Sequence, residues 1–593
     1  MIFPFRRRTR QVFLAGHDFQ EPDRLRLDGV HKHAIETGRN RLIVTGIAFF
    51  AVFAAIGVRM VDISLFQGTE VTPRAPKMAR TAELSMGRAD IVDRNGVILA
   101  TSLPTVALYA NPKEILDARE AATLLLTVFP DMKQAELQSR LSIDRSFVYL
   151  RRNLTPQQQY SVNSLGIPGL YFEKSERRIY PQGSLVSHVV GLADIDGKGI
   201  AGIEKSFDTD LRAGSEPLRL SIDSRVQLVV HEELKKSITE FKAIGGTGMV
   251  MDVRTGELLA MVSQPDYDPN FPAQTTSESM FNRATLGVYE MGSTFKLFNT
   301  AIALDSGKAT PNSIYDASKP IKISRFTISD FHGKYRPQTV TEILTNSSNI
   351  GSAKMAVDFG TETQRAYFSK FGLLQPAAIE LPEIGSPLVP RPWREINTMT
   401  ISYGHGIAVT PLQTISGISS LVNGGFYRQA TLLKYQPGTE IPAVPILKGK
   451  TSQQMRRLMR LVVTQGSGKK ADVPGYHVGG KTGSAEKTDG RKGYKRKSLL
   501  SSFVAVFPTG NPRYAIIVMI DEPQGTKETY GFATAGWTAA PAISRIASQI
   551  GPMLDVPPAP DSEDPALAGS RNQMAQTPPA QPSSSRGVKH VGQ

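Results

Sequence analysis

Three short motifs in this chain combine residue types that could carry out acyl transfer without a histidine. They are Ser293-Thr294-Phe295-Lys296, Ser347-Ser348-Asn349 and Lys481-Thr482-Gly483. A serine hydroxyl becomes a nucleophile once a base removes its proton, and a lysine amine with a lowered pKa can be that base. Each motif alone is common by chance. Together, and in this order, they predict a serine acyl-transfer site.

The first motif is expected at the start of a helix, because apolar residues follow Ser293 at helical spacing and Gly307 is a stop signal. Residues three apart share a helix face, so Lys296 can place its amine against the Ser293 hydroxyl. A lysine that is desolvated beside other cations has a lowered pKa and can act as general base. The N-terminal end of the helix also favours a developing oxyanion.

The second motif places a hydroxyl and an amide two residues apart, at Ser347 and Asn349. On extended or irregular backbone both side chains lie on the same side. The hydroxyl could then relay a proton to a leaving amine, while the amide holds a substrate peptide group. A helix cap or a turn is the alternative interpretation of this motif.

The third motif continues to Ser484 and offers a cation, two hydroxyls and a glycine that permits close approach of a substrate backbone. In a strand, Thr482 and Ser484 project from the same face. They could bind a carboxylate while Lys481 supplies positive potential, with Gly483 between them.

Two other chemistries compete for these residues. Residues 475–482 also satisfy the Walker A pattern of a nucleotide-binding loop. That pattern needs an apolar strand before it and a helix after it, and the sequence predicts neither. A Ser-His-Asp triad could draw on nine histidines, but no Gly-x-Ser-x-Gly elbow is present.

The composition is that of a folded protein rather than a disordered one, with 40% hydrophobic and 21% charged residues. The absence of cysteine excludes disulfides and thiol catalysis. The net charge of +15 does not predict a nucleic-acid partner, because the basic residues form no aromatic-interleaved face. The densest basic run, residues 491–497, is interpreted as a solvated loop, with an anionic partner or membrane surface as the alternative.

An apolar stretch from Leu42 to Val58 follows an arginine-rich N-terminal segment in the sequence. It predicts a transmembrane signal-anchor helix over residues 42–61, with the basic tail 1–41 in the cytoplasm and the remainder exported. A cleaved signal peptide is the alternative, and Ala55-Ile56-Gly57 is a weak cleavage site. Signal peptides rarely carry so long a segment before their apolar core.

The exported part has two compositions and a tail. Residues 62–220 alternate short β-like runs with polar turns, including a hairpin over Ile91–Leu99, and are expected to form a pedestal or dimerisation-type domain. Residues 221–552 contain further hairpin signals separated by helical stretches, which predicts an α+β domain with an antiparallel sheet. The Pro- and Ser-rich residues 553–593 are expected to be disordered.

The motifs and their surroundings resemble those of class B penicillin-binding proteins. The resemblance rests on Tyr289–Lys296 and Gly480–Ala485, and it extends to landmarks spread over about residues 42–545. These landmarks are residues 88–100, residues 178–183 with His188 and Gly191, residues 220–223, residues 410–413 and residues 521–523. The chain departs from the family at two positions, with Met291 where proline is common and Ala89 where glycine is common.

The resemblance implies a penicillin-binding transpeptidase fold, with a β-rich pedestal and one transmembrane helix, and it implies no cofactor or metal. It makes Ser293 the acylated nucleophile, Lys296 its base, and Ser347 and Lys481 the path of the proton to the departing D-alanine. The N–H groups of Ser293 and Ser484 would form the oxyanion hole. The substrate-binding residues would be Asn349, Thr482, Gly483 and Ser484.

The implied reaction is DD-transpeptidation of peptidoglycan stem peptides at D-Ala-D-Ala, on strands made from lipid-linked precursors, and β-lactam antibiotics would acylate the same serine. The division-specific type is favoured over the elongation-specific type by the Tyr530–Pro541 ending and the lack of cysteine. Its partners would be an FtsW-type glycosyltransferase and other divisome proteins at the cell inner membrane, with the catalytic domain periplasmic. A β-lactamase or a β-lactam sensor, and a non-catalytic divisome scaffold, are the competing hypotheses.

Overall fold

The computed structural model describes residues 43–58, 87–214, 216–323, 326–331, 333–488, 494–560 and 564. The chain forms two compact units, Met1–Ser85 and Met86–Gln593. In the first unit, the described residues form a helix over 43–58 with exposed apolar side chains. Among all the described residues, no helix combines the length and apolarity that crossing a membrane requires. Residue 42 and residues 59–61 of the expected membrane helix lie outside the described residues, as does the expected tail 1–41.

The pedestal, residues 87–220, is built on a sheet with the strand order β3-β2-β1-β7, in which β4 also pairs with β2. The predicted hairpin over Ile91–Leu99 is present, since Ile91 pairs with Ala100 across an antiparallel β1–β2 turn. Gly96 has φ +91° in that turn, a conformation that favours glycine. The strands are β1 (Ile91–Val92), β2 (Ile98–Ala110), β3 (Val148–Leu154), β4 (Leu170–Ile179), β5 (Leu192–Ala193), β6 (Gly199–Ala201) and β7 (Leu218–Arg219).

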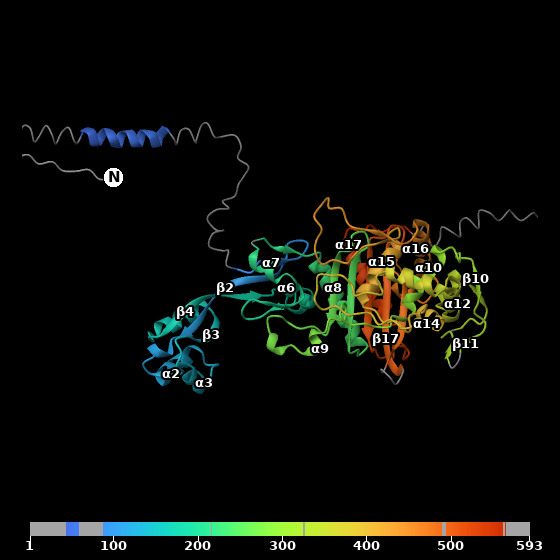
Figure 1. The fold of residues 1–593 in the computed structure, drawn as a ribbon, viewed down its shortest axis with the longest axis horizontal. Helices are drawn as coiled ribbons and strands as arrows, with labels where there is room; N and C mark the ends of the chain where they lie inside the picture. The colour runs from blue at the N-terminus through green and yellow to red at the C-terminus, as the bar shows by residue number, and fades with distance from the viewer. Residues whose placement is uncertain are drawn as a thin grey trace, which may run out of the picture. The chain divides into compact units, whose positions relative to one another are not determined.

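The pedestal is less β-rich than the sequence suggested, because helices pack around its sheet (Figure 1). The longest, α2, starts where the Asp117 side chain accepts hydrogen bonds from two backbone N–H groups. Its buried face, with Leu125, joins Leu108 and Leu150 of the strands in one core. The helices are α2 (Ala118–Val128), α3 (Gln134–Leu141), α4 (Pro156–Ser164), α5 (Ser187–Val190), α6 (Gly202–Ser206) and α7 (Asp208–Ala213), with 3₁₀ turns η1 (Pro112–Glu114) and η2 (Gly183–Val186).

A buried ion cluster holds the base of the pedestal together. Glu204 on α6 is fully buried and forms ion pairs with both Arg88 and Arg178. Arg88 also pairs with Asp208, with its Nη1 at 2.6 Å from a carboxylate oxygen. Because buried charges are costly unless they are paired, these residues fix the start of the pedestal against β4 and α6.

The C-terminal region, residues 221–560, contains a five-stranded antiparallel sheet in the order β16-β17-β18-β8-β9. The hairpin signals expected within residues 221–552 correspond to β8–β9 and β17–β18. The basic run 491–497 is less of a loop than expected, because β17 begins at Tyr494. The strands are β8 (Gly245–Asp252), β9 (Leu258–Gln264), β16 (Gly479–Thr488), β17 (Tyr494–Phe507) and β18 (Tyr514–Asp521).

Helices cover both faces of this sheet (Figure 1). On one face, α8 and α17 bury side chains such as Val230 and Ile546 against Val518. On the other face, α10, α15 and α16 form the larger core, and every residue of α10 is buried. These helices are α8 (Ser224–Glu240), α10 (Phe295–Asp305), α15 (Pro411–Val422), α16 (Gly449–Thr464) and α17 (Ala539–Met553).

A helical subdomain lies beside α10 and confirms the expected α+β class. It packs Met355 and Phe368 into the same core as Phe298 of α10. Its elements are α11 (Val340–Asn346), α12 (Asn349–Phe359), α13 (Thr361–Lys370), α14 (Glu395–Ile401), β10 (Ile314–Asp316), β11 (Ile321–Ile323), β12 (Phe326–Ile328) and β13 (Pro337–Thr339). The remaining elements of the region are η3 (Pro272–Gln274), α9 (Ser277–Met280), η4 (Gly292–Thr294), β14 (Phe426–Tyr427), β15 (Val444–Pro445) and η5 (Lys469–Ala471).

The pedestal is tied to the segment that leads to Ser293. Asn270 exchanges hydrogen bonds with the backbone of Tyr180, at 3.0 and 2.9 Å. His188 Nε2 lies 2.8 Å from the carbonyl oxygen of Ser279. Burial lowers the pKa of His188 to about 4, because desolvation penalises the charged imidazole. The segment that leads to Ser293 is therefore held at the pedestal through Asn270 and Ser279.

The folded body continues past residue 552, after which a disordered tail was expected. Val556 is buried, and Asp564 forms a buried ion pair with Arg460 on α16, with an N–O distance of 2.8 Å. Burial of these side chains places residues 553–560 and 564 on the folded body. The rest of the predicted disordered tail lies outside the described residues.

Candidate active site

The three predicted motifs meet where β16, η4 and the α11–α12 turn come together. Ser293 lies in η4, directly before α10 rather than within its first turn. Gly292 has φ +55°, and a side chain there would lie 2.7 Å from the Ser484 carbonyl oxygen. A side chain at Gly483 would lie 2.5 Å from the carbonyl oxygen of Met291. Both glycines therefore allow the serine turn to lie directly against β16.

Lys296 contacts Ser293 of the first motif and both Ser347 and Asn349 of the second. Its Nζ lies 3.0 Å from Ser293 Oγ, 3.1 Å from Ser347 Oγ and 2.7 Å from Asn349 Oδ1. The side chain is fully buried, on the first turn of an apolar helix. Desolvation, with the nearby charge of Lys481, holds the pKa of Lys296 well below its usual range, although Asp330 opposes this shift. An amine with such a pKa has a free lone pair that can accept the serine proton.

Ser347 links the two lysines. It adopts the left-handed conformation at the end of α11, with φ +61°, which is uncommon for a residue other than glycine. This conformation directs both its carbonyl oxygen and its hydroxyl to Lys296, the carbonyl at 2.6 Å from Nζ. The same hydroxyl lies 3.0 Å from Lys481 Nζ.

Lys481 is fully buried on β16, and burial lowers its pKa to about 7. Its Nζ donates to the carbonyl oxygen of Thr482 at 3.1 Å and lies 3.2 Å from the Thr482 hydroxyl. A continuous series of short contacts thus runs from Ser293 through Lys296, Ser347 and Lys481 to Thr482. This series can carry a proton without a histidine.

The hydroxyl of Thr482 has a partner that the sequence did not reveal. Ser467, in the exposed turn after α16, places its Oγ 2.8 Å from Thr482 Oγ1. Ser484, two residues further along β16, accepts a hydrogen bond from the backbone N–H of Ala535 at 3.1 Å. The only local signal at Ser467 is its position between two glycines, which also fits an ordinary turn.

Asp330 is a second residue that sequence reasoning missed. Its carboxylate accepts hydrogen bonds from the backbone N–H groups of Asn349 and Ile350 and from the hydroxyl of Ser348. It thus caps the N-terminal end of α12, where negative charge is favourable. Asn349 is fixed further, because its Nδ2 donates to the carbonyl oxygen of Ser329 at 2.9 Å. No sequence signal connects this loop with the second motif.

The competing nucleotide-binding loop does not match this geometry. Gly479–Thr488 is one continuous strand, paired with β17 through Lys481 and Thr482. A phosphate-binding loop would need a turn and a helix at these residues. The Walker A match is therefore coincidental.

Family models match two parts of the chain. Residues 246–544 match the penicillin binding protein transpeptidase domain, and residues 84–238 match the penicillin-binding protein dimerisation domain. The fold is similar to a crystal structure of penicillin binding protein 3 from Mycobacterium tuberculosis complexed with aztreonam, with a TM-score of 0.63 at 24% identity, over 80% of this chain and 97% of that one.

Sequence relatives cover most of the chain. It is 41% identical to the probable peptidoglycan D,D-transpeptidase FtsI of Caulobacter vibrioides, over 86% of this chain and 89% of the relative. It is 31% identical to the peptidoglycan D,D-transpeptidase FtsI of Escherichia coli K12, over 84% of this chain and 87% of that protein. With both domains matched and these relatives aligned along most of their length, the chain belongs to the class B penicillin-binding proteins of the FtsI type.

Proposed function

We propose that this protein is a peptidoglycan D,D-transpeptidase, which cross-links stem peptides at the division septum through a serine acyl-enzyme. The names of its relatives support the reaction, and the FtsI type supports the division role over elongation. The observation that carries the proposal is the series of contacts from Ser293 through Lys296 and Ser347 to Lys481. Nucleophile, base and proton relay are already in mutual contact.

In the first half-reaction, Ser293 Oγ attacks the carbonyl carbon between the two D-alanines while Lys296 takes the hydroxyl proton. The N–H groups of Ser293 and Ser484 stabilise the oxyanion. The proton passes through Ser347 and Lys481 to the nitrogen of the terminal D-alanine, which leaves as the C–N bond breaks. An ester between Ser293 and the donor peptide remains.

In the second half-reaction, the amine of a neighbouring stem peptide attacks the ester carbonyl. The amine loses its proton to the same relay, the C–O bond to Ser293 breaks, and the hydroxyl recovers a proton from Lys296. An amide between two peptides is the product. No external oxidant, nucleotide or energy source is needed, since one amide bond replaces another.

Substrate binding uses the groups around this relay. Thr482 and Ser484 bind the terminal carboxylate of the donor, beside the buried amine of Lys481, and Gly483 lets the peptide approach the strand. Asn349 binds a substrate amide. β-Lactams acylate Ser293 in the same way, because their reactive carbonyl takes the place of the scissile peptide.

We also propose that the chain is a single-pass inner-membrane protein with a cytoplasmic N-terminus and a periplasmic catalytic domain. The apolar stretch over residues 42–61, the arginines before it and the exposed apolar side chains of the helix over 43–58 support this topology. The domain arrangement would be a pedestal over 62–220 and a transpeptidase domain over 221–552. An FtsW-type glycosyltransferase and other divisome proteins would be its partners.

The test is covalent labelling of the full-length protein with a fluorescent penicillin, beside its Ser293→Ala variant. Label on the parent that is absent from the variant supports the acylated serine, and a label that persists for hours excludes a β-lactamase. If the parent protein unfolds cooperatively, and so is folded, but penicillin does not label it, the transpeptidase proposal is refuted. The non-catalytic divisome scaffold is then favoured. Septal localisation of a fluorescent fusion separates the division role from elongation, which would place the protein along the side wall.

A further inference from the structure

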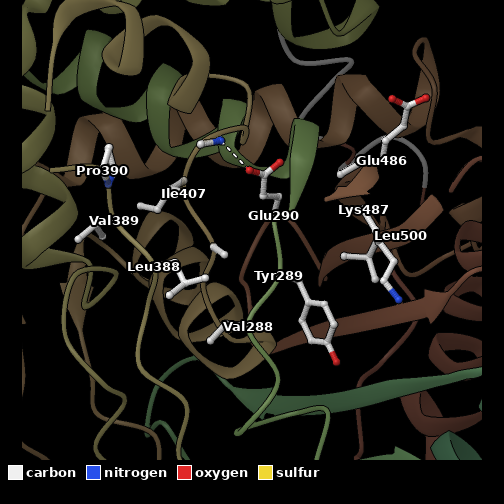
Figure 2. Close-up of a pocket in the computed structure, with 13 residues that line it drawn as sticks. Val288, Tyr289, Glu290, Leu388, Val389, Pro390, Ile407, Glu486, Lys487 and Leu500 are labelled. Carbon is white, nitrogen blue, oxygen red and sulfur yellow. Dashed lines mark hydrogen bonds between the residues drawn. The ribbon is translucent and has the colours of Figure 1, made fainter. Parts of the chain in front are cut away.

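The strand that carries the third motif is held by a neighbouring strand on one side only. Among the described residues, β16 pairs with β17 alone. Past Ser484, the second half of β16 borders a cavity of about 460 Å³, and Figure 2 shows Glu486 and Lys487 in its lining. The position of Lys481 and Thr482 therefore depends also on what holds the first residues of β16, at the end away from this cavity.

The C-terminal half of α16 lies directly against the start of β16. A side chain at Gly479 would lie 3.0 Å from the backbone nitrogen of Arg460 on α16. The guanidinium of Arg460 donates from Nη1 to the carbonyl oxygen of Val478 at 2.9 Å, three residues before Lys481. A shift of α16 against β16 would therefore move the backbone that carries Lys481.

The charge of Arg460 is balanced by two carboxylates, and one of them comes from beyond α17. Arg460 Nε lies 2.8 Å from Asp564 Oδ2, and Nη1 lies 2.6 Å from Asp472 Oδ1. The side chains of Arg460 and Asp564 are each 6% exposed, whereas that of Asp472 is 38% exposed. Asp564 is thus the buried partner, in a place where an unpaired charge is costly. We name residues 554–560 together with Asp564 the C-terminal strap.

The C-terminal strap lies along the segment that leads into β16. Val556 is 2% exposed and belongs to the same core as Val478. The N–H of Ala559 donates to the carbonyl oxygen of Gly475 at 2.7 Å. A side chain at Gly475, where φ is +79°, would lie 3.0 Å from Pro558 Cβ. The strap therefore covers the residues just before β16 and also supplies the carboxylate that holds the arginine of α16.

We propose that the C-terminal strap is a positioning element for the acyl-transfer site, in which Asp564 acts through Arg460 to hold the start of β16 in place. The inference rests on the proposed function, since it concerns the rate of the same reaction. Without the Asp564 carboxylate, the guanidinium would turn toward water and leave the carbonyl oxygen of Val478. The backbone of Lys481 and Thr482 would then loosen, although no group that touches the substrate has changed.

The test measures how fast a fluorescent penicillin acylates the full-length protein in detergent, for the parent and for three variants. The final amount of label counts the folded molecules, whereas the rate constant reports the geometry of the site within them. We expect Asp564→Ala to lower the rate constant about tenfold, a part of the roughly hundredfold that a 1 Å misplacement can cost. Asp564→Glu keeps the carboxylate and should restore the rate of the parent. Asp144→Asn, at a side chain that is 93% exposed, is the control and should leave the rate unchanged.

A second measurement reports the position of β16 without any ligand. Hydrogen exchange of backbone N–H groups, followed by mass spectrometry, detects local opening of the chain. Peptides over residues 472–484 should exchange faster in Asp564→Ala than in the parent, whereas peptides over β8 should exchange equally in both. If Asp564→Ala does not fold, Asp564→Asn, which keeps the shape of the side chain, replaces it in both measurements.

An unchanged rate constant in Asp564→Ala would overturn the inference even if less protein is labelled, because the strap would then only stabilise the fold. Equal loss of rate in Asp564→Ala and Asp564→Glu, or equal exchange over residues 472–484 in parent and variant, would overturn it as well. These results are distinct from failure of the proposed function. A folded parent that penicillin does not label refutes the transpeptidase itself, and the inference falls with it. A parent that penicillin labels at the same rate as Asp564→Ala refutes the strap alone.

Discussion

Replacing Lys481 by methionine should abolish acylation and at the same time stabilise the fold near neutral pH. The lysine amine is fully buried, and burial lowers its pKa from 10.5 to about 7. Methionine has a similar length and carries no charge to desolvate. The relay from Ser347 would end at Lys296, so the leaving D-alanine would receive no proton.

The size of the stabilisation follows from the shift in pKa. At about 1.4 kcal/mol per pH unit, a fall of the pKa from 10.5 to about 7 corresponds to roughly 5 kcal/mol of unfavourable burial below pH 7. Methionine loses the hydrogen bonds of Lys481 to Ser347 and Thr482, each worth about 1 kcal/mol. The net expectation is a gain of roughly 2 kcal/mol in the free energy of unfolding.

The gain should depend on pH in a defined direction. Below pH 7 the amine is protonated in both the folded and the unfolded chain, so the parent bears the full penalty. Between pH 7 and 10.5 the unfolded chain binds a proton that the folded chain does not, and the parent gains about 1.4 kcal/mol per pH unit relative to the variant. The difference should be largest at pH 6.5 and nearly gone by about pH 8.5.

The assay is urea unfolding followed by tryptophan fluorescence at these two pH values, with penicillin labelling of the same samples. The chain has two tryptophans, Trp393 and Trp537, and both lie in the C-terminal region, so the signal reports that region alone. Lys308→Met, in the exposed turn after α10, is the control, because it removes no buried charge. A Lys481→Met variant that is less stable than the parent at pH 6.5 would refute the reasoning. The same difference in free energy of unfolding between variant and parent at both pH values would also refute it.

Three further changes test other parts of the structure. Ser467→Ala should raise KM for a donor peptide about fivefold with kcat within twofold, because it removes a hydroxyl beside the proposed site of the donor's terminal carboxylate. Ser467→Thr should restore the KM of the parent, and equal effects of both substitutions would contradict a role for the hydroxyl. Asp330→Asn should move the acidic limb of the penicillin acylation profile to lower pH, because Asp330 raises the pKa of Lys296, and a shift to higher pH would contradict this. Glu204→Gln should destabilise the pedestal by about 3–5 kcal/mol, since it removes the buried carboxylate that Arg88 and Arg178 share. Unchanged resistance of the pedestal to limited proteolysis would contradict that.

The motifs of the site could be predicted from the sequence because each is local. Ser293 and Lys296 lie one helical turn apart, and Thr482 and Ser484 lie on one strand, so spacing alone predicts their relation. The order of the motifs then suggested one site. The expectation that Ser347 and Asn349 act together agrees with their shared contact with Lys296.

The remaining parts of the site depend on contacts between distant segments. Ser467 meets Thr482 only because α16 returns to the sheet edge, and Asp330 meets α12 only through the fold of the loop after β12. The pedestal helices were missed for another reason. Strand and turn signals dominate residues 87–220, and α2 is recognised mainly by its cap at Asp117. Local pattern predicts elements and motifs, whereas long-range packing decides which side chains complete them.

The hydrogen bonds between Tyr180 and Asn270, and between His188 and Ser279, affect how relatives of this protein can be recombined. A chimera that exchanges only residues 87–220 would cut across these paired surfaces and loosen the segment that ends at Ser293. Residues 265–282 must be transferred with the pedestal to keep the junction intact. The exchangeable module is thus discontinuous in sequence, and its boundary passes about ten residues before Ser293.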